Sequence, residues 1–183
     1  MNTHQTILNR RTIHSYTEQS VDDDAINRAL EAAHHAPCHR LTFPWRFIIV
    51  GRRSRDLIAD LGVLLKQERT GLSPEAIESA RGKLLAPDRL VVVCQVACQD
   101  PFQAKEDYAA CSCAIQNLTL SLAADGIGSK WSSGAITRHP ETYRICEVDP
   151  AGHEIIGFIW AGHPREIPTV ARPPLESMVK TIP

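Results

Sequence analysis

Apolar and polar positions along the chain fall into two kinds of pattern. Short apolar runs bounded by Gly, Pro or polar residues predict buried strands at Phe47–Val50, Arg89–Ala97 and Glu154–Ala161. A fourth, short strand is predicted around Ser129–Gly134. The remaining apolar positions recur with helical spacing between these strands.

The segments between these strands carry the residue patterns of helices. Asp22 to Asp24 form an acidic helix start, and Pro37 ends that helix. The predicted helices are a short one before Arg10, one from Asp22 to Pro37, one capped by Ser54 and running to Arg69, one starting at Ser73–Pro74, one over Glu106–Asp125 and one over Pro140–Cys146. The helix over 106–125 is apolar nearly all round and should be central. Strands that alternate with helices in 183 residues predict a single domain that is a mixed α/β sandwich.

The last 21 residues, 163–183, differ from the rest. They carry five prolines, which exclude a regular helix or central strand. A segment of this kind needs a surface to lie on, and we expect that surface to be a second copy of the chain. A disordered end is the alternative.

Charge and composition narrow the function. Twenty Lys and Arg balance twenty-one Asp and Glu, for a net charge of −1, so the chain lacks the positive field that nucleic acid or anionic lipid requires. The sequence shows no signal peptide and no run long enough to span a membrane, which predicts a soluble, cytoplasmic protein. We expect its six cysteines to be reduced thiols that pack in the core.

Three segments carry candidate chemistry. The row Arg10–His14 offers several donors and a hydroxyl, which suits a phosphate. Gly126–Gly134 combines small residues and hydroxyls, which let a backbone approach a flat ligand. A metal site is the alternative for a third group: His34, His35, Cys38 and His39, although Pro37 breaks the helix that would align them. No hydrolytic triad or paired carboxylates are visible, so a cofactor should bring the chemistry of an enzyme.

Several motifs, in order, resemble the nitroreductase family and its small members in particular. RRTIHSY at 10–16 looks like the family's R-R-S-x-R-x-[FY], and APCHRLTFPWRF at 36–47 looks like A-P-x-H-K-x-x-x-P-W-x-F. The chain from 108 to 134 is similar to the family's apolar helix with its following G-x-G-x-x-W-x-[ST]-G, and 155–164 resembles I-x-G-F-x-x-x-G-x-P. The resemblance covers most of the chain, from Arg10 to about Pro164.

This resemblance implies an α+β fold: a three-layer α/β/α sandwich with a mixed central sheet, in an intertwined homodimer. It implies FMN in a groove built by both chains, with residues 163–183 over the partner. The implied FMN ligands are Arg10, Arg11, Thr12, His14, Trp131, Ser132, Ser133, Gly134 and Arg172 from one chain, with His35 and His39 from the other. The stretch implied to meet the nicotinamide nucleotide is Ser121, Leu122, Ala123, Ala124, Asp125 and Gly126.

Some residues depart from the family pattern. Cys38, Leu41 and Phe43 replace frequent Ser, Asn and Gln residues, and His14 replaces an Arg or Lys. The implied activity is hydride transfer from NAD(P)H to a small electron-poor acceptor, such as a nitroaromatic or quinone, by a ping-pong cycle and without a bound metal. An FMN-binding module without turnover, or a metal-binding protein, are the alternatives.

Overall fold

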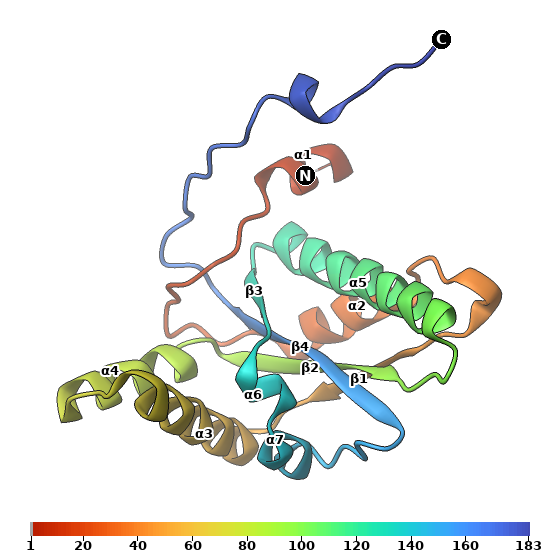
Figure 1. The fold of residues 1–183 in the computed structure, drawn as a ribbon. Coiled ribbons are helices and arrows are strands. Elements are labelled where there is room, and N and C mark those ends of the chain that lie inside the picture. The colour runs from red at the N-terminus through yellow and green to blue at the C-terminus, as the bar shows by residue number, and fades with distance from the viewer. Residues whose placement is uncertain (1) are drawn as a thin grey trace.

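The computed structural model describes residues 2–183 and contains one four-stranded sheet (Figure 1). Its strand order is β1-β2-β4-β3, and each neighbouring pair is antiparallel. The strands are β1 (Trp45–Ile49), β2 (Arg89–Val96), β3 (Gly128–Ser132) and β4 (His153–Gly162). The longest, β4, therefore lies between β2 and the edge strand β3.

Helices cover both faces of this sheet. They are α1 (Thr3–Asn9), α2 (Asp23–His34), α3 (Arg52–Thr70), α4 (Pro74–Leu85), α5 (Pro101–Ala124), α6 (Ala135–Arg138) and α7 (Pro140–Ile145), with short 3-10 turns at His39–Leu41 and Leu175–Met178. Helices α2 and α5 pack on one face, and α3, α4, α6 and α7 lie on the other (Figure 1). The predicted three-layer α+β sandwich is confirmed.

The expected mixed sheet is wrong, because the named strands pair only in antiparallel fashion. The connection from β1 to β2 holds two helices that form a hairpin, so the chain returns reversed rather than parallel. A single helix, α5, joins β2 to β3, and these two strands do run in the same direction, but β4 is inserted between them. Within residues 2–183, parallel pairing occurs at the isolated bridge between Thr12 and Ser129, outside the named strands.

Some predicted boundaries also need correction. Ser54 does not cap α3, which begins at Arg52 after Gly51. Helix α5 begins at Pro101, five residues before the predicted start, because the Asp100 side chain accepts a hydrogen bond from the Phe102 N–H and Pro101 is suited to the first helical position. The first strand covers Trp45–Ile49 rather than Phe47–Val50.

Two hydrophobic cores hold the layers together. The core under α2 and α5 includes Ile115, Leu118 and Ile159, and the core on the other face is centred on Phe158 and Trp160. The expected core position of the cysteines holds for Cys94, Cys111 and Cys146, which are buried; it fails for Cys113, which is exposed, and for the half-buried Cys38 and Cys98. Cys113 lies on α5 but faces away from the sheet side of that helix.

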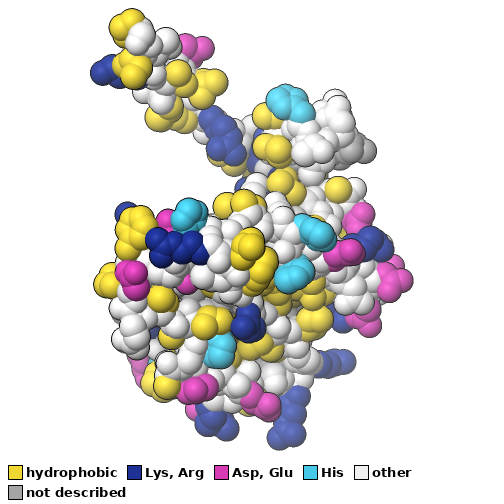
Figure 2. All heavy atoms as spheres, turned by 90° about the vertical axis from the view of Figure 1, so that its right-hand side faces the viewer, with side chains coloured by type: hydrophobic (Ala, Val, Ile, Leu, Met, Phe, Trp, Pro, Cys, Tyr) yellow, Lys and Arg dark blue, Asp and Glu magenta, His cyan; other side chains and the backbone are white. Residues whose placement is uncertain are grey.

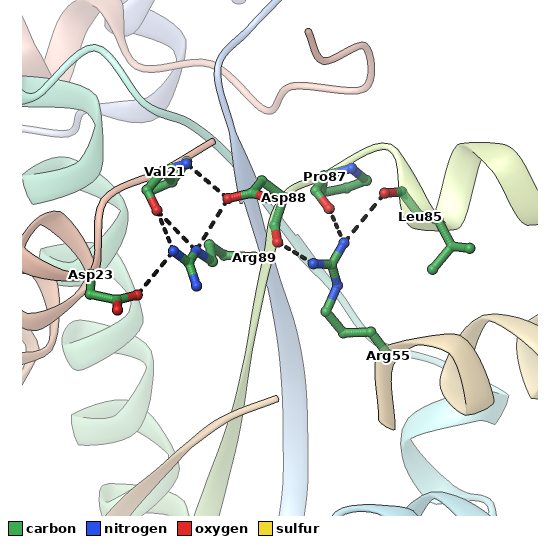
Figure 3. Close-up of polar contacts among 7 residues, drawn as sticks. All are labelled: Val21, Asp23, Arg55, Leu85, Pro87, Asp88 and Arg89. Carbon is green, nitrogen blue, oxygen red and sulfur yellow. Dashed lines mark hydrogen bonds and ion pairs between the residues drawn. The ribbon is translucent and has the colours of Figure 1, made fainter. Parts of the chain in front are cut away.

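A polar network joins the starts and ends of several elements (Figure 3). Asp88 accepts a hydrogen bond from the Val21 N–H at 2.8 Å and pairs with Arg89 at 3.2 Å, and Arg89 also reaches Asp23 at 2.9 Å. Arg55 donates to the backbone carbonyls of Leu85, Pro87 and Asp88. Arg55 thereby satisfies the Leu85 carbonyl at the end of α4, where helix C-termini leave carbonyls without partners, and two carbonyls in the turn that follows.

Both ends of the chain extend from the body on one side, where α1 and the C-terminal segment rise above α5 (Figure 1). The C-terminal segment is fixed only at its base: Tyr16 bridges to Pro164, and Arg165 N–H donates to the Ser15 carbonyl at 3.0 Å. Beyond that base, residues 165–183 are almost entirely exposed. None of the helices within residues 2–183 has the length and hydropathy needed to cross a bilayer.

Candidate functional site

The predicted phosphate-binding residues, Arg10–His14, are held beside strand β3 by backbone contacts. The Ile13 N–H donates to the Ser129 carbonyl at 3.0 Å, next to the bridge between Thr12 and Ser129. A Cβ at position 128 would lie 2.6 Å from Ile13 Cγ1, so a glycine is required there for Ile13 to pack on the strand. Arg10, Arg11 and Thr12 are therefore held at the end of α1, while the side chain of His14 is exposed.

Two arginines, Arg10 and Arg11, lie at this point, and the charge of Arg172 acts on Arg10 from the C-terminal segment. The pKa of Arg10 lies below its ordinary value, first because the side chain is partly buried and then because Arg172 and Arg11 repel its charge. Arg11 donates to the carbonyls of Leu8 and Arg10, at 2.6 and 2.9 Å. Within residues 2–183, none of these three arginines pairs with a carboxylate. The cluster carries an uncompensated positive charge that suits a dianion.

A cavity of about 170 Å³ lies next to this cluster. It is lined by Thr6, Asn9, Arg10, Arg11, Ile13, Ala123, Gly126, Ile127, Gly128, Ser129, Pro164 and Ile167. Ser129 is 2% exposed, and its hydroxyl has no hydrogen-bond partner within residues 2–183. A buried polar group of this kind normally has a partner, so this hydroxyl is suited to a ligand in the cavity.

The far end of β3 carries an exposed indole, that of Trp131. Trp131 is 39% exposed, and its indole lies over Gly157 of β4, where any Cβ would overlap it. Ser132 accepts a hydrogen bond from Trp160 Nε1 at 2.9 Å, and Ser133 is exposed. Gly134 adopts φ +132°, a conformation that favours glycine, and lets α6 start directly after the strand. Arginines and indole thus lie at opposite ends of one short strand.

The two predicted histidines lie elsewhere. His35 and His39 are exposed in the segment after α2, and His39 Nε2 lies 3.6 Å from Glu106 Oε1 near the start of α5. Ala123, at the other end of α5, shares the cavity with Arg10. Seventeen residues of helix separate Glu106 from Ala123, which is about 25 Å at 1.5 Å per residue. One chain therefore does not bring the arginines and these histidines together.

The segment that carries His39 is strained but firmly held. Arg40, Leu41 and Phe43 have φ of 57°, 54° and 44°, which side chains rarely adopt. Thr42 donates to Asp107 Oδ1 at 2.6 Å, and Gln103 donates to the same oxygen at 2.9 Å.

The same segment presents apolar side chains to solvent. Leu41 is 70% exposed and Phe43 43% exposed. Histidine and apolar side chains stand side by side on this face of the molecule (Figure 2).

The stretch predicted for the nicotinamide nucleotide ends α5. Ala123 and Gly126 line the cavity, whereas Leu122 is 1% exposed and faces the core. Asp125 pairs with Arg28 at 2.7 Å. Ser121 and Ala123 are half-buried, and Ala124 is exposed. Only part of this stretch is therefore able to touch a ligand.

The alternative metal site finds no geometric support. His34 Nδ1 accepts a hydrogen bond from Trp45 Nε1 at 3.2 Å, so this histidine already has a partner. Across residues 2–183, no three His, Cys, Asp or Glu side chains are arranged to hold a metal ion.

Two residues at the site escaped the sequence analysis. Ser129 belongs to the small-residue segment but gave no signal of its own. Gly157 interrupts an apolar strand, and a glycine inside a strand often marks the close approach of another group. A glycine at this position therefore predicts that another group packs against the strand, and in the structure that group is the Trp131 indole.

The chain is similar to known proteins over most of its length. The model of the family described as "Nitroreductase family" matches residues 7–163. YfhC of Bacillus subtilis is 31% identical to this chain over 169 residues, which are 91% of this chain and 86% of YfhC. Its name describes it as an NAD(P)H nitroreductase.

Solved structures share the fold. A nitroreductase-like family protein from Bacillus cereus superimposes with a TM-score of 0.85 at 24% identity, covering 100% of this chain and 96% of that one. A nitroreductase-type protein from Desulfovibrio desulfuricans, described in complex with FMN, gives a TM-score of 0.78 at 24% identity, covering 100% of this chain and 98% of the other. With the family model matched over most of its length, this chain belongs to the nitroreductase family.

Proposed function

We propose that this protein is an FMN-dependent oxidoreductase that transfers hydride from NAD(P)H to a small electron-poor acceptor, of the nitroaromatic or quinone type. As a member of the nitroreductase family, the chain is an oxidoreductase. The observation that carries the proposal is the unpaired arginine cluster at one end of β3, with the exposed indole of Trp131 at the other.

The residues fit FMN in chemical terms. Arg10 and Arg172, with Arg11 beside them, would hold the phosphate, because like charges that repel one another in the free protein are neutralised by a dianion. The unpartnered Ser129 hydroxyl and the exposed Thr12 would supply further polar contacts. Trp131 would lie along the flat ring system, with Ser133 and Gly134 at its edge.

A second copy of the chain would complete the site. His35 and His39 lie in the segment after α2, and His39 lies beside Glu106 in the first part of α5. This segment is too far from Arg10 for the histidines to reach a flavin held by the same chain, so we assign them to the flavin of the partner. Groups of exposed apolar side chains at separate places on the chain support a dimer, because apolar surface of this kind often marks a contact with another protein. They are Ile7 and Leu8 on α1, Leu41 and Phe43 after α2, and Ile167, Val170, Leu175, Met178, Val179 and Ile182 in the C-terminal segment.

When bound, FMN would supply two-electron chemistry, so that a hydride could pass from NAD(P)H to the acceptor in a ping-pong cycle. The chain's own residues bind and orient. The arginines would anchor the phosphate, Trp131 would lie along the ring system, and the apolar side chains of Leu41 and Phe43 from the partner would help to exclude water. No side chain is assigned as an obligate acid or base, because the chain's tasks are to position the ring and set its potential, and water can supply the protons that the reduced acceptor takes up.

Reduction of the bound flavin tests this function. The purified protein should retain FMN, show its yellow absorption and lose that absorption when NADH or NADPH is added without oxygen. Addition of a quinone or nitroaromatic, still without oxygen, should restore the yellow colour. In steady-state assays, initial rates at several acceptor concentrations should give parallel double-reciprocal lines. Protein that holds FMN but is not bleached by either nucleotide would instead be a binding module. Colourless protein with stoichiometric metal would contradict the whole assignment.

A further inference from the structure

A second cavity lies on the opposite side of the sheet from the arginine cluster. It has a volume of about 340 Å³, at the small end of the range of ligand-binding pockets. Helices α3 and α4 form an antiparallel hairpin there, and α6 lies against α3 (Figure 1). The lining residues are Gly62, Leu65, Lys66, Arg69, Ala80, Lys83, Leu84, Ala135 and Ile136.

The interior of this cavity is apolar. Leu65, Leu84 and Ile136 are half-buried, and Ala80 is 8% exposed. Gly62 keeps the floor open, because a Cβ at that position would lie 2.9 Å from Leu84 Cδ1 and 3.3 Å from Ile136 Cδ1. An occupant with an alkyl chain or an aromatic ring would bury its apolar surface there.

The charged side chains at the rim of this cavity are all positive. Lys66, Arg69 and Lys83 are exposed, and none of the three forms an ion pair within residues 2–183. No acidic residue is among the lining residues. The long stems of such side chains extend the apolar wall while their charged ends remain in water. An apolar interior below three unpaired cations is complementary to a molecule with an apolar tail and an anionic head.

We propose that this cavity, defined by α3, α4 and α6, is a binding site for an amphipathic carboxylate, such as a medium-chain fatty acid. The head would lie among Lys66, Arg69 and Lys83, and the tail would extend along Leu84 and Ile136 toward Ala80. The site is separate from the arginine cluster, and it stands whether or not the oxidoreductase assignment is correct.

The cavity is also linked to the ring end of β3. Ala135 and Ile136 line the cavity, and Ser133 and Gly134 directly precede them in the chain. Thr137 donates to the Gly134 carbonyl at 3.0 Å, which fixes this short turn. An occupant that pushes on α6 would move the two residues assigned to the flavin edge, so binding should change the absorption spectrum of bound FMN.

Calorimetry on the FMN-loaded protein tests the site with three probes: hexanoate, octanoate and decanoate, each below the concentration at which it forms micelles. We expect one site per chain. Each two added methylenes should lower Kd by up to about fifteenfold, which corresponds to about 0.8 kcal/mol per methylene, until the tail fills the cavity. Octanol, which has the same tail without the charge, should bind at least tenfold more weakly than octanoate.

Variants identify the site. K66Q/R69Q/K83Q should lose at least tenfold in octanoate affinity, and A80L should abolish binding by filling the interior. The matched control R52Q/R53Q/K105Q removes the same charge from exposed positions outside the cavity and should bind octanoate like the wild type. Circular dichroism checks the fold of each variant. Because none of these measurements uses turnover, their failure would leave the oxidoreductase assignment untouched.

Three results would overturn the proposal. They are equal affinity for octanol and octanoate, equal loss in the two charge variants, and no heat of binding with any chain length. A change in the sedimentation coefficient of K66Q/R69Q/K83Q, without a change in octanoate affinity, would assign the surface to a contact between copies of the chain instead.

Discussion

The indole of Trp131 lies directly on the backbone of Gly157, so that any Cβ at position 157 would overlap the indole nitrogen. Gly157 pairs with Val93 on β2, next to a bulge between Val93 and Cys94. A glycine in the middle of the sheet thus sets the position of the one exposed tryptophan at the candidate site.

Gly157→Ala should displace Trp131. We expect a loss of stability on the order of 1–3 kcal/mol, the usual cost of overpacking, and a loss of FMN affinity of at least tenfold. Thermal unfolding and flavin titration measure the two effects. Gly82→Ala is the control, because its Cβ would meet open space within α4, and it should instead stabilise the chain by about 0.5–1 kcal/mol. Unchanged flavin affinity in Gly157→Ala would remove Trp131 from the site.

Arg10→Ala should weaken FMN binding by on the order of 2 kcal/mol, or about thirtyfold, because it removes a charge-assisted pair with the phosphate. The same change should leave the free protein no less stable, since Arg10 is repelled there by Arg172 and Arg11. Equilibrium dialysis measures the affinity, with the exposed Arg53→Ala on α3 as a control. Full retention of flavin by the Arg10 variant would contradict the phosphate assignment.

Ser129→Ala separates a structural role from a ligand role. An unpartnered buried hydroxyl destabilises a folded protein by about 1–3 kcal/mol, so its removal should stabilise the flavin-free chain. If the hydroxyl contacts FMN, the same variant should bind FMN several-fold more weakly. Urea denaturation without flavin and flavin titration give the two readouts. Lower stability in the free protein would show that the hydroxyl already has a partner there.

The sequence predicted the layers of the fold well and the sheet direction poorly. Helical spacing around Ile26 and Leu30 and the continuous apolar run of β2 are local signals, and both elements formed as expected. Strand direction depends on how α3 and α4 fold back on one another, which is a tertiary property. The mixed sheet that the resemblance implied is therefore replaced by antiparallel pairs, of which the α3–α4 hairpin accounts for the pair β1 and β2.

Some features of the candidate site could likewise be predicted from the sequence, and others could not. Arg10 and Arg11 stand out in the sequence as adjacent donors, whereas their position beside β3 is seen only in the structure. The approach of Arg172, more than 160 residues away, has no local signal and came only from the family resemblance. The separation of His39 from Arg10 along α5 is likewise a matter of helix length and packing, which residue types alone do not report.

Removal of the C-terminal segment should disrupt the shared site. A chain that ends at Glu166 keeps the contacts of Pro164 and Arg165 with the body but lacks Arg172 and the exposed apolar side chains beyond it. We expect it to lose FMN and to dissociate. Sedimentation and flavin content measure both effects. Arg172→Ala alone should weaken FMN binding without dissociation, and a truncated chain that stays yellow and monomeric would contradict the two-chain groove.

The cysteines allow a prediction about pH. Burial raises the pKa of Cys94 and Cys111 to about 12 and that of Cys146 to about 11, from an ordinary value near 9. The folded chain therefore keeps three protons that the unfolded chain releases above pH 9. Stability that is fully present below pH 9 should be lost as pH rises toward 11–12, by about 1 kcal/mol per buried thiol at pH 10.

Urea denaturation at pH 8 and pH 10 measures this loss, and Cys111→Ala should show a smaller difference between the two pH values than the wild type. Thiol labelling at pH 8 checks the burial directly: Cys38, Cys98 and Cys113 should react quickly in the native protein, and the other three only after unfolding. Rapid labelling of all six thiols in the native state would contradict the buried positions. Equal pH dependence in Cys111→Ala and the wild type would show that this thiol ionises alike in the folded and unfolded chain.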